Sequence, residues 1–229
     1  MIAGGSYHQY VMAVERVERR LKRVAAALNA AGVRYAVIGG NAVAAWVAKA
    51  DASATRSTID VDLLIDRPDL DAVTQVFEGL GFKRHDRGRV ERAAACSVAP
   101  CGRRGPLSAA DKPRRYTTNG PALMRFSDPD EPSRRSGVHL VWAGQKVLPS
   151  YAHPTPSVKE AVFDKEHGFW LLELAALVRM KLTSFRDIDR VHVADLLSVG
   201  LIDDAVRASL PADFLERLRT VEATVEPME

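Results

Sequence analysis

Two aspartates on an otherwise apolar segment constrain the fold of this chain most. Asp60 and Asp62 stand one residue apart within the run Ile59–Ile65. Because alternate residues of a β-strand point to the same face, a strand here would present both carboxylates together. Two carboxylates that close repel each other unless a cation lies between them. The pattern therefore favours a divalent metal that also holds the phosphates of a nucleotide.

The segment before these aspartates has the pattern of a strand, a tight turn and a helix. Val33–Ile38 is typical of a short buried strand, which Gly39 and Gly40 interrupt, and Asn41 is the expected N-cap of a helix through Trp46. A Gly-Gly turn lets the backbone approach a phosphate closely, and the helix behind it points its amides at the anion. Both glycines and the asparagine are therefore candidate nucleotide-binding residues.

The remaining periodicity predicts an α/β (α+β) fold, with a small mixed sheet flanked by helices and a helical C-terminal part. Ala122–Phe126 and Val138–Val141 are two further expected strands. We expect an α/β domain over residues 1–150, with a basic loop or arm at about 84–120 where the periodicity fails. Residues 151–229 are expected to form a mainly helical part packed on that domain.

Composition narrows the classes of protein to which the chain can belong. Hydrophobic residues make up 47% of the 229 residues, which argues against disorder. The net charge is only +3, but the segment from Lys83 to Arg115 contains ten Lys and Arg and only three acidic residues. This basic arm is either a solvated surface segment or a contact for a phosphate-rich partner such as nucleic acid. It contains few aromatic residues, which weakens base stacking as its mode of binding.

The cysteines and the hydropathy pattern bear on the cellular location. Cys96 and Cys101 have no second pair to complete a zinc site, and we interpret them as ordinary thiols of a reducing cytosol. No apolar run is long enough to cross a bilayer, and the N-terminal residues lack the pattern of a secretion signal. The prediction is a cytoplasmic protein with no membrane partner.

The order of these features resembles a known family. A Gly39-Gly40 turn between strand and helix, followed by Arg56 and then by Asp60 and Asp62, is similar to the nucleotidyltransferase superfamily, whose fold is shared with DNA polymerase beta. The most similar subgroup in pattern is the small bacterial nucleotidyltransferase-like proteins, which include the AbiEii-type toxins of toxin–antitoxin systems. The resemblance covers roughly residues 33–65 and 171–197.

The resemblance implies roles for further residues. Members of the subgroup carry a later Lys and Asp on helices, which here would be Lys181 and Asp189 at the nucleotide. Lys181 would reach the triphosphate, or else pack its stem on the helix with its head in water. Arg56 would steady phosphate charge, or else form a surface ion pair. The rest of the charged run between Arg186 and Asp195 is interpreted as ion pairs across one helix surface.

One position departs from the family pattern. Active members place a third carboxylate on a neighbouring strand, whereas the inward polar residue of the strand expected here is His139. A neutral imidazole accepts a proton but adds no negative charge, and Mg²⁺ prefers oxygen ligands. Asp128 and Asp130 on the preceding turn are alternatives for the missing acid. Of the other histidines, His192 is expected on a helix surface.

The resemblance implies a Mg²⁺-dependent nucleotidyltransferase that moves a nucleotide from an NTP to an unknown acceptor, which is a small molecule, tRNA or protein. The likeness to the AbiEii-type subgroup implies a toxin–antitoxin role. Asp60 and Asp62 would hold the metal, and His139 would take the proton of the acceptor or contribute little. Two alternatives remain. The fold serves as a catalytically weakened nucleotide- or partner-binding module, or the basic arm binds nucleic acid on a sheet that acts as scaffold.

Overall fold

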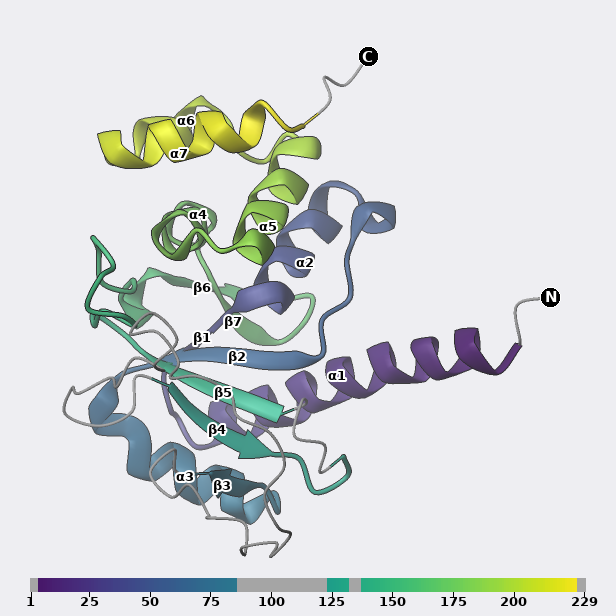
Figure 1. Ribbon diagram of the computed structural model, residues 1–229. Helices are drawn as coiled ribbons and strands as arrows, with labels where there is room; N and C mark the ends of the chain where they lie inside the picture. Colours follow the sequence, from purple (N-terminus) through teal and green to yellow (C-terminus); the bar gives the residue numbers. More distant parts are fainter. Residues whose placement is uncertain (1–3, 86–122, 132–136, 226–229) are drawn as a thin grey trace, which may run out of the picture.

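A mixed β-sheet with helices on both faces organises the molecule, as a computed structural model shows (Figure 1). The structure describes residues 4–85, 123–131 and 137–225, and side chains from residue 11 onwards. The sheet has seven strands in the order β3-β4-β5-β2-β1-β7-β6. The strands are β1 (Tyr35–Ile38), β2 (Asp60–Ile65), β3 (Lys83–His85), β4 (Leu123–Ser127), β5 (Gly137–Trp142), β6 (Ala161–Asp164) and β7 (Phe169–Leu172).

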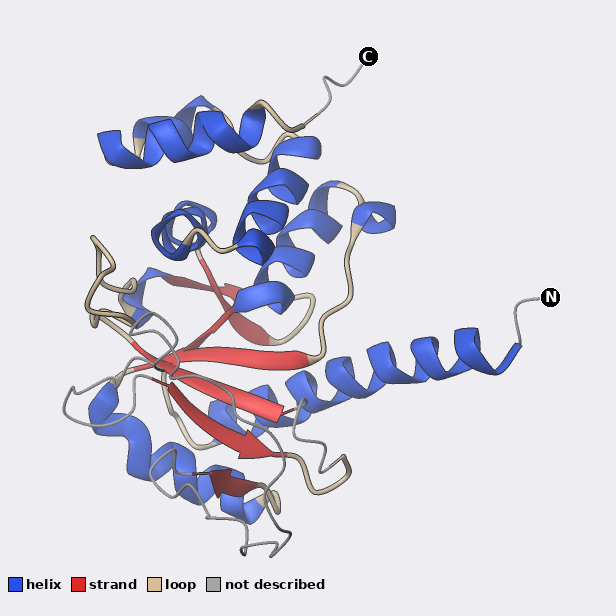
Figure 2. Cartoon of the chain, viewed as in Figure 1, coloured by secondary structure: helices blue, strands red, loops and turns tan. Residues whose placement is uncertain are grey.

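The helices form two layers around this sheet (Figure 2). On one side lie α1 (Gly4–Ala30) and α3 (Leu70–Gly79), and on the other lie α2 (Gly39–Ala50), α4 (Leu174–Ser184) and α5 (Asp187–Ser198). Beyond α4 and α5 lie α6 (Asp204–Ala208) and α7 (Ala212–Glu222). The expected α/β class, with a small mixed sheet and a helical C-terminal part, is confirmed.

The central strands are apolar because helices cover both faces of the sheet. All four residues of β1 are buried, and so are the last three of β2. In α1, Leu21, Val24 and Leu28 recur on one buried face at three- and four-residue spacing, so this helix packs on the sheet through one stripe. Within β2, burial is intermediate at the first and third positions, and those positions are the two aspartates.

Strand direction decides which residues meet. β1 pairs antiparallel with β2 and parallel with β7, whereas β2 pairs parallel with β5. Strands β6 and β7 follow residue 150 and still belong to the same sheet, so the sheet continues beyond the domain boundary predicted from the sequence. Most of the basic arm, over 86–122, lies outside the described residues. Among the described residues, no helix is long and apolar enough to span a membrane.

Candidate active site

Asp60 and Asp62 are the first and third residues of β2, so their side chains leave the same face of the sheet. This face carries α2, α4 and α5, because a side chain built at Gly39, where α2 begins, would collide with the carboxylate of Asp62. Ile38, the last residue of β1, lies directly opposite Asp62 in the antiparallel register. The side chains are partly exposed, with 28% of the Asp62 side chain accessible. Both carboxylates are therefore available at the end of β1 where the chain turns into α2.

The diglycine bend lies against these aspartates. Gly39 has φ +70°, a left-handed conformation that glycine adopts without steric cost. A Cβ at Gly40 would lie 3.1 Å from the hydroxyl oxygen of Thr58 and 3.6 Å from Nε2 of His192. Because neither glycine has a side chain, the backbone of the bend can lie close to Asp62. The first amides of α2 therefore lie beside the carboxylates.

Asn41 does not cap α2, as the sequence had suggested. The helix begins at Gly39, with Ile38 in the N-cap position and no side-chain cap, so Asn41 lies within the first turn. Its side-chain amide donates a hydrogen bond to the backbone carbonyl of Asp60 at 2.7 Å. The asparagine thus fastens the start of β2 to α2, which positions the aspartates.

A row of polar residues crosses three strands at the level of Asp62. His139 in β5 lies opposite Asp62, and Arg125 in β4 lies opposite His139. Residues directly opposite on paired strands share a face, so all three side chains point the same way. Nδ1 of His139 lies 3.1 Å from Oδ1 of Asp62. When Nδ1 carries the proton, it donates to the carboxylate, and Nε2 remains as an acceptor.

Asp128 and Asp130, the alternatives for a third carboxylate, are committed to α1. Both oxygens of Asp128 bind arginines, at 2.6 Å from Nε of Arg20 and 2.7 Å from a terminal nitrogen of Arg23. Asp130 pairs with Arg23 at 2.6 Å. Although burial acts to raise it, the hydrogen bonds from Arg20 and Arg23 hold the pKa of Asp128 below its ordinary value. These acids fix α1 to the turn after β4, and the hypothesis that they complete the metal site is wrong.

The two aspartates have the chemistry of a cation site. Oδ1 of Asp60 is buried without a hydrogen-bond partner among the described residues. Burial raises the pKa of Asp60, against the opposing charges of His139 and Arg125. The ligand atoms of Asp60, Asp62 and His139 do not all lie within 4.8 Å of one another in the described part of the chain. The donor set is therefore a pair of carboxylates, and oxygen donors of this kind suit Mg²⁺.

Lys181 and Asp189 face the same region from α4 and α5 as a buried pair. Nζ of Lys181 lies 3.3 Å from Oδ1 of Asp189, and the two residues are 5% and 1% exposed. The lysine head is therefore not in water. Asp189 also accepts a hydrogen bond from Ser184 at 2.7 Å and two from the guanidinium of Arg186. Its oxygens are saturated, so it holds cations rather than offering itself to a ligand.

Arg186, between α4 and α5, is a further cation on this side of the site. The sequence had suggested that it forms surface ion pairs on a helix. Its Nε donates to Asp189 at 2.7 Å, while 65% of its side chain stays exposed. The hydrogen bond to Asp189 raises the pKa of Arg186, and the charge of Asp62 acts on it as well. A guanidinium held from behind by a buried carboxylate leaves donors free to face the site. In the sequence alone, nothing distinguishes Arg186 from the other charged residues between Arg186 and Asp195.

The turn that presents Arg186 is held in a left-handed conformation. Phe185 has φ 47°, a conformation that costs a non-glycine residue roughly 1 kcal/mol or more. The guanidinium groups of Arg190 and Arg217 lie 5.2 Å and 5.3 Å from the centre of its ring. Arg217 also donates to the carbonyl of Thr183 at 3.1 Å, near the end of α4. Three helices therefore fix the direction in which Arg186 leaves the turn.

Arg56 forms an ion pair, which was the simpler of its two expected roles. Its Nε lies 2.7 Å from Oδ1 of Asp195 on α5. The pair borders a small cavity between α2 and α5, which Gly40 and His192 also line. His192 therefore lies beside the diglycine bend, and its expected place on the helix surface is wrong. The helical period of the sequence suggested that His192 is exposed, because it does not show that α2 packs across α5 in the folded chain.

Burial of His192 predicts a loss of stability in acid. Desolvation, with the charge of Lys181, lowers its pKa from 6.5 to about 4. Since the folded-state pKa is depressed, the fold favours the neutral ring, and this contribution is lost as the pH falls from 6.5 to about 4. That gap corresponds to about 3 kcal/mol at most. Chemical denaturation across this pH range should show a flatter acid limb for His192→Gln than for the wild type. The control His85→Gln changes an exposed histidine whose ring contacts the hydroxyl of Ser127, and it should keep the wild-type slope. Equal slopes in wild type and His192→Gln would contradict the assignment.

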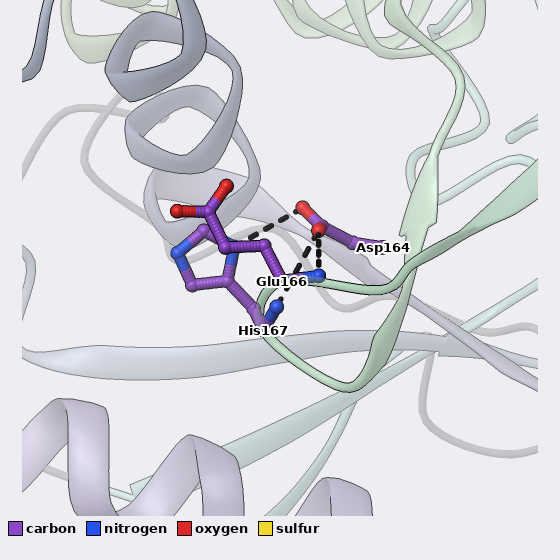
Figure 3. A group of neighbouring side chains, drawn as sticks. All are labelled: Asp164, Glu166 and His167. Atoms are coloured by element: carbon purple, nitrogen blue, oxygen red, sulfur yellow. Dashed lines mark hydrogen bonds and ion pairs between the residues drawn. The ribbon is translucent and has the colours of Figure 1, made fainter.

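A second cluster of potential metal ligands lies at the turn between β6 and β7 (Figure 3). Ligand atoms of Asp164, Glu166 and His167 lie within 4.8 Å of one another. However, Nζ of Lys49 already lies 3.1 Å from Oδ2 of Asp164, and the backbone amide of Glu166 donates to its Oδ1 at 3.1 Å. The ammonium takes the place of a cation, so the cluster reinforces the turn.

Comparison with known proteins gives two structural similarities. One is to the solution structure of the antibiotic-resistance factor ANT(2'')-Ia, at 12% identity over 92% of this chain and 93% of that chain, with a TM-score of 0.44. The other is to an antigenic nucleotidyltransferase-like protein from Paracoccidioides brasiliensis, at 12% identity over 92% of each chain, with a TM-score of 0.45. No family model and no curated protein matches the sequence. The chain is thus similar in structure to a resistance factor and to a nucleotidyltransferase-like protein, and its function has to be inferred from its own site.

Proposed function

We propose that the protein is a nucleotidyltransferase, which moves a nucleotide from an NTP to an acceptor hydroxyl. The observation that carries this proposal is the pair Asp60 and Asp62, placed on one face of β2 against the Gly39–Gly40 bend, with a buried oxygen of Asp60 lacking a hydrogen bond among the described residues. Asp60 and Asp62 would hold Mg²⁺. The ion would supply positive charge to the triphosphate and to the leaving pyrophosphate.

Groups from α2 and from the α4–α5 turn would bind the phosphates of the nucleotide. Amides at the start of α2, after Gly39 and Gly40, bind phosphate oxygens because the helix N-terminus carries partial positive charge. Arg186 faces the same phosphates from the α4–α5 turn, and the buried ammonium of Lys181 adds positive charge behind it. Asp189 positions both cations and does not touch the nucleotide. Arg56, held by Asp195, contributes charge at the mouth of the site.

In the transfer step, the acceptor hydroxyl oxygen forms a bond to the α-phosphorus of the NTP. The bond from that phosphorus to the bridging oxygen breaks, and pyrophosphate leaves with its electron pair. His139 takes the proton of the hydroxyl at Nε2, because its Nδ1 is engaged with Asp62. Asp62 thereby orients the imidazole as well as contributing charge.

Replacement of His139 by glutamine tests this assignment of the base. Transfer of label from α-labelled NTPs, in a mixture of cellular acceptors with Mg²⁺, should fall about 10²-fold or more, since general bases contribute 10²–10⁴. The Kd of the NTP should stay unchanged, because the ring does not bind phosphate. A loss that high pH restores would support the role, since hydroxide then replaces the missing base.

A second candidate function is a binding module without turnover. It is favoured by one observation: the strand beside the aspartates carries His139 where a third acid would add negative charge. In that case wild-type protein binds NTP with Mg²⁺ and gains thermal stability, yet transfers no label. Equal transfer by wild type and His139→Gln would instead remove the histidine from the mechanism.

Several finer expectations from the sequence and from the family resemblance remain predictions. These are the AbiEii-type subgroup, a toxin–antitoxin role, a cytoplasmic location and a domain boundary near residue 150. Nucleic-acid binding by the basic arm is also a prediction, since 86–122 lies outside the described residues.

A further inference from the structure

We propose that the cavity between α2 and α5 receives a ribose hydroxyl of the nucleotide, and that Asp195 accepts its hydrogen bond. The inference rests on the proposed function, because it assigns a selectivity for ribonucleotides to the same site. Its basis is a buried oxygen of Asp195 that lacks a hydrogen-bond partner among the described residues, in a cavity that Gly40 also lines.

The two carboxylate oxygens of Asp195 have different surroundings. Oδ1 accepts a hydrogen bond from Nε of Arg56 at 2.7 Å. Oδ2 is buried and has no hydrogen-bond partner in the described part of the chain, and the residue as a whole is only 9% exposed. A buried carboxylate oxygen without a donor is unfavourable. Oδ2 is therefore an acceptor that a donor group of a ligand would satisfy.

His192 brings a second polar atom without a partner to the same cavity. It precedes Asp195 by about one turn of α5 and lines the cavity with it, and its Nδ1 is buried with no hydrogen bond to any described residue. Burial lowers the pKa of His192 to about 4, so the ring is neutral at pH 7, with one nitrogen that donates and one that accepts. A hydroxyl, which also donates and accepts, matches a carboxylate oxygen and a neutral imidazole, whereas Asp195 repels a phosphate.

The cavity has room for one small group. Its volume is about 10 Å³, which suits one water molecule or one hydroxyl but not a whole sugar or base. A hydroxyl can therefore enter while the ring that carries it stays at the mouth, where 66% of the Arg56 side chain is exposed. The rest of the lining includes small and aliphatic side chains, from Val43, Ala44, Val47 and Ala54.

The position of the cavity favours the nucleotide over the acceptor as the source of the hydroxyl. Gly40 lines the cavity and also lies in the first turn of α2, whose amides would bind the phosphates. In an NTP the ribose follows the α-phosphate directly, so it has to lie close to that turn. The acceptor would instead approach His139 on β5, and β5 and β1 lie on opposite sides of β2 in the sheet. The ribose is therefore the group within reach of Asp195.

The test compares matched nucleotides by calorimetry. The α,β-methylene analogues of ATP, GTP, CTP and UTP are titrated with Mg²⁺ into the wild-type protein, and the analogue that binds most tightly is compared with its 2′-deoxy and 3′-deoxy forms. At least one deoxy form should bind about 10-fold more weakly, because it leaves Oδ2 of Asp195 unsatisfied. In Asp195→Asn, Arg56 should hold the amide oxygen and turn the amide nitrogen to the cavity, so the preference should be lost. The ratio of the two affinities is independent of any general weakening of NTP binding.

Two further variants bracket this result. Asp187→Asn, an exposed change on the same helix, should keep the preference for the ribonucleotide. Ala44→Val narrows the cavity while the ion pair of Arg56 with Asp195 stays in place, and it should lose the preference even if Asp195→Asn does not fold.

The outcomes separate the two proposals. If no analogue binds the wild type with Mg²⁺, the proposed function fails and the ribose subsite fails with it. If an analogue binds and both deoxy forms bind equally well, the cavity holds only water, and the ribose subsite alone is overturned. A preference that Asp195→Asn and Ala44→Val both retain in full also overturns it.

Discussion

Replacement of Asp60 by asparagine is expected to abolish nucleotidyl transfer while raising the melting temperature of the metal-free protein. Transfer should fall about 10³-fold or more, because the variant loses one of the two carboxylates that would hold Mg²⁺. Burial raises the pKa of Asp60, so its ionised form is disfavoured in the folded state. This group therefore contributes stability below its ordinary pKa of 3.8 and loses it as the pH rises through the folded-state value. At neutral pH, an uncharged amide avoids that cost.

Mg²⁺ should reverse the order of stability. Calorimetric melting at neutral pH should show that Mg²⁺ raises the melting temperature of the wild type and leaves Asp60→Asn unchanged, since only the wild type offers both carboxylates. Asp66→Asn, the same chemical change just beyond the other end of β2, should match the wild type in transfer and in its response to Mg²⁺. Full transfer by Asp60→Asn would remove the aspartate pair from the mechanism.

Replacement of Asp189 by asparagine is expected to give the largest loss of stability, about 3–5 kcal/mol in the free energy of unfolding. Asp189 is 1% exposed, and it compensates the ammonium of Lys181, which is 5% exposed. Without the carboxylate, a buried positive charge has no partner and Arg186 loses its anchor. Urea denaturation at neutral pH measures the effect. The NTP affinity of the folded variant should also fall, because Arg186 is no longer held towards the site.

The control for this change lies two residues earlier on the same helix. Asp187 pairs with Arg190, but 96% of its side chain is exposed, so Asp187→Asn should change stability by less than about 1 kcal/mol. A comparable loss in both variants would show that charge near the start of α5, rather than the buried pair, stabilises this region.

The sequence predicts the centre of the fold because local rules act there. Alternation along β2 places Asp60 and Asp62 on one face whatever the strand pairs with. The glycines after β1 require a turn, and the apolar runs of β1 and β5 require burial. Local rules also place His139 on a strand, whereas its position next to the aspartates was implied by the family resemblance and is found in the pairing of β2 with β5.

The rest of the site depends on long-range register, which periodicity does not contain. Arg20 meets Asp128 across 108 residues of sequence, and this pairing removes Asp128 from the metal site. Arg125 alternates with the buried Met124 and Phe126, but its place beside Asp60 follows only from the pairing of three strands. The short strand β6 and helix α6 have too few residues to show a period.

The separation of Asp62 from His139 has a consequence for when the protein becomes active. These residues are 77 positions apart, and Lys181 and Arg186 follow later still. Ribosomal synthesis proceeds from the N-terminus, so a nascent chain carries both aspartates long before it can assemble the groups around them. If the proposed function holds, a chain whose synthesis has not yet reached Arg186 has no complete site, and nucleotidyl transfer begins only after that point.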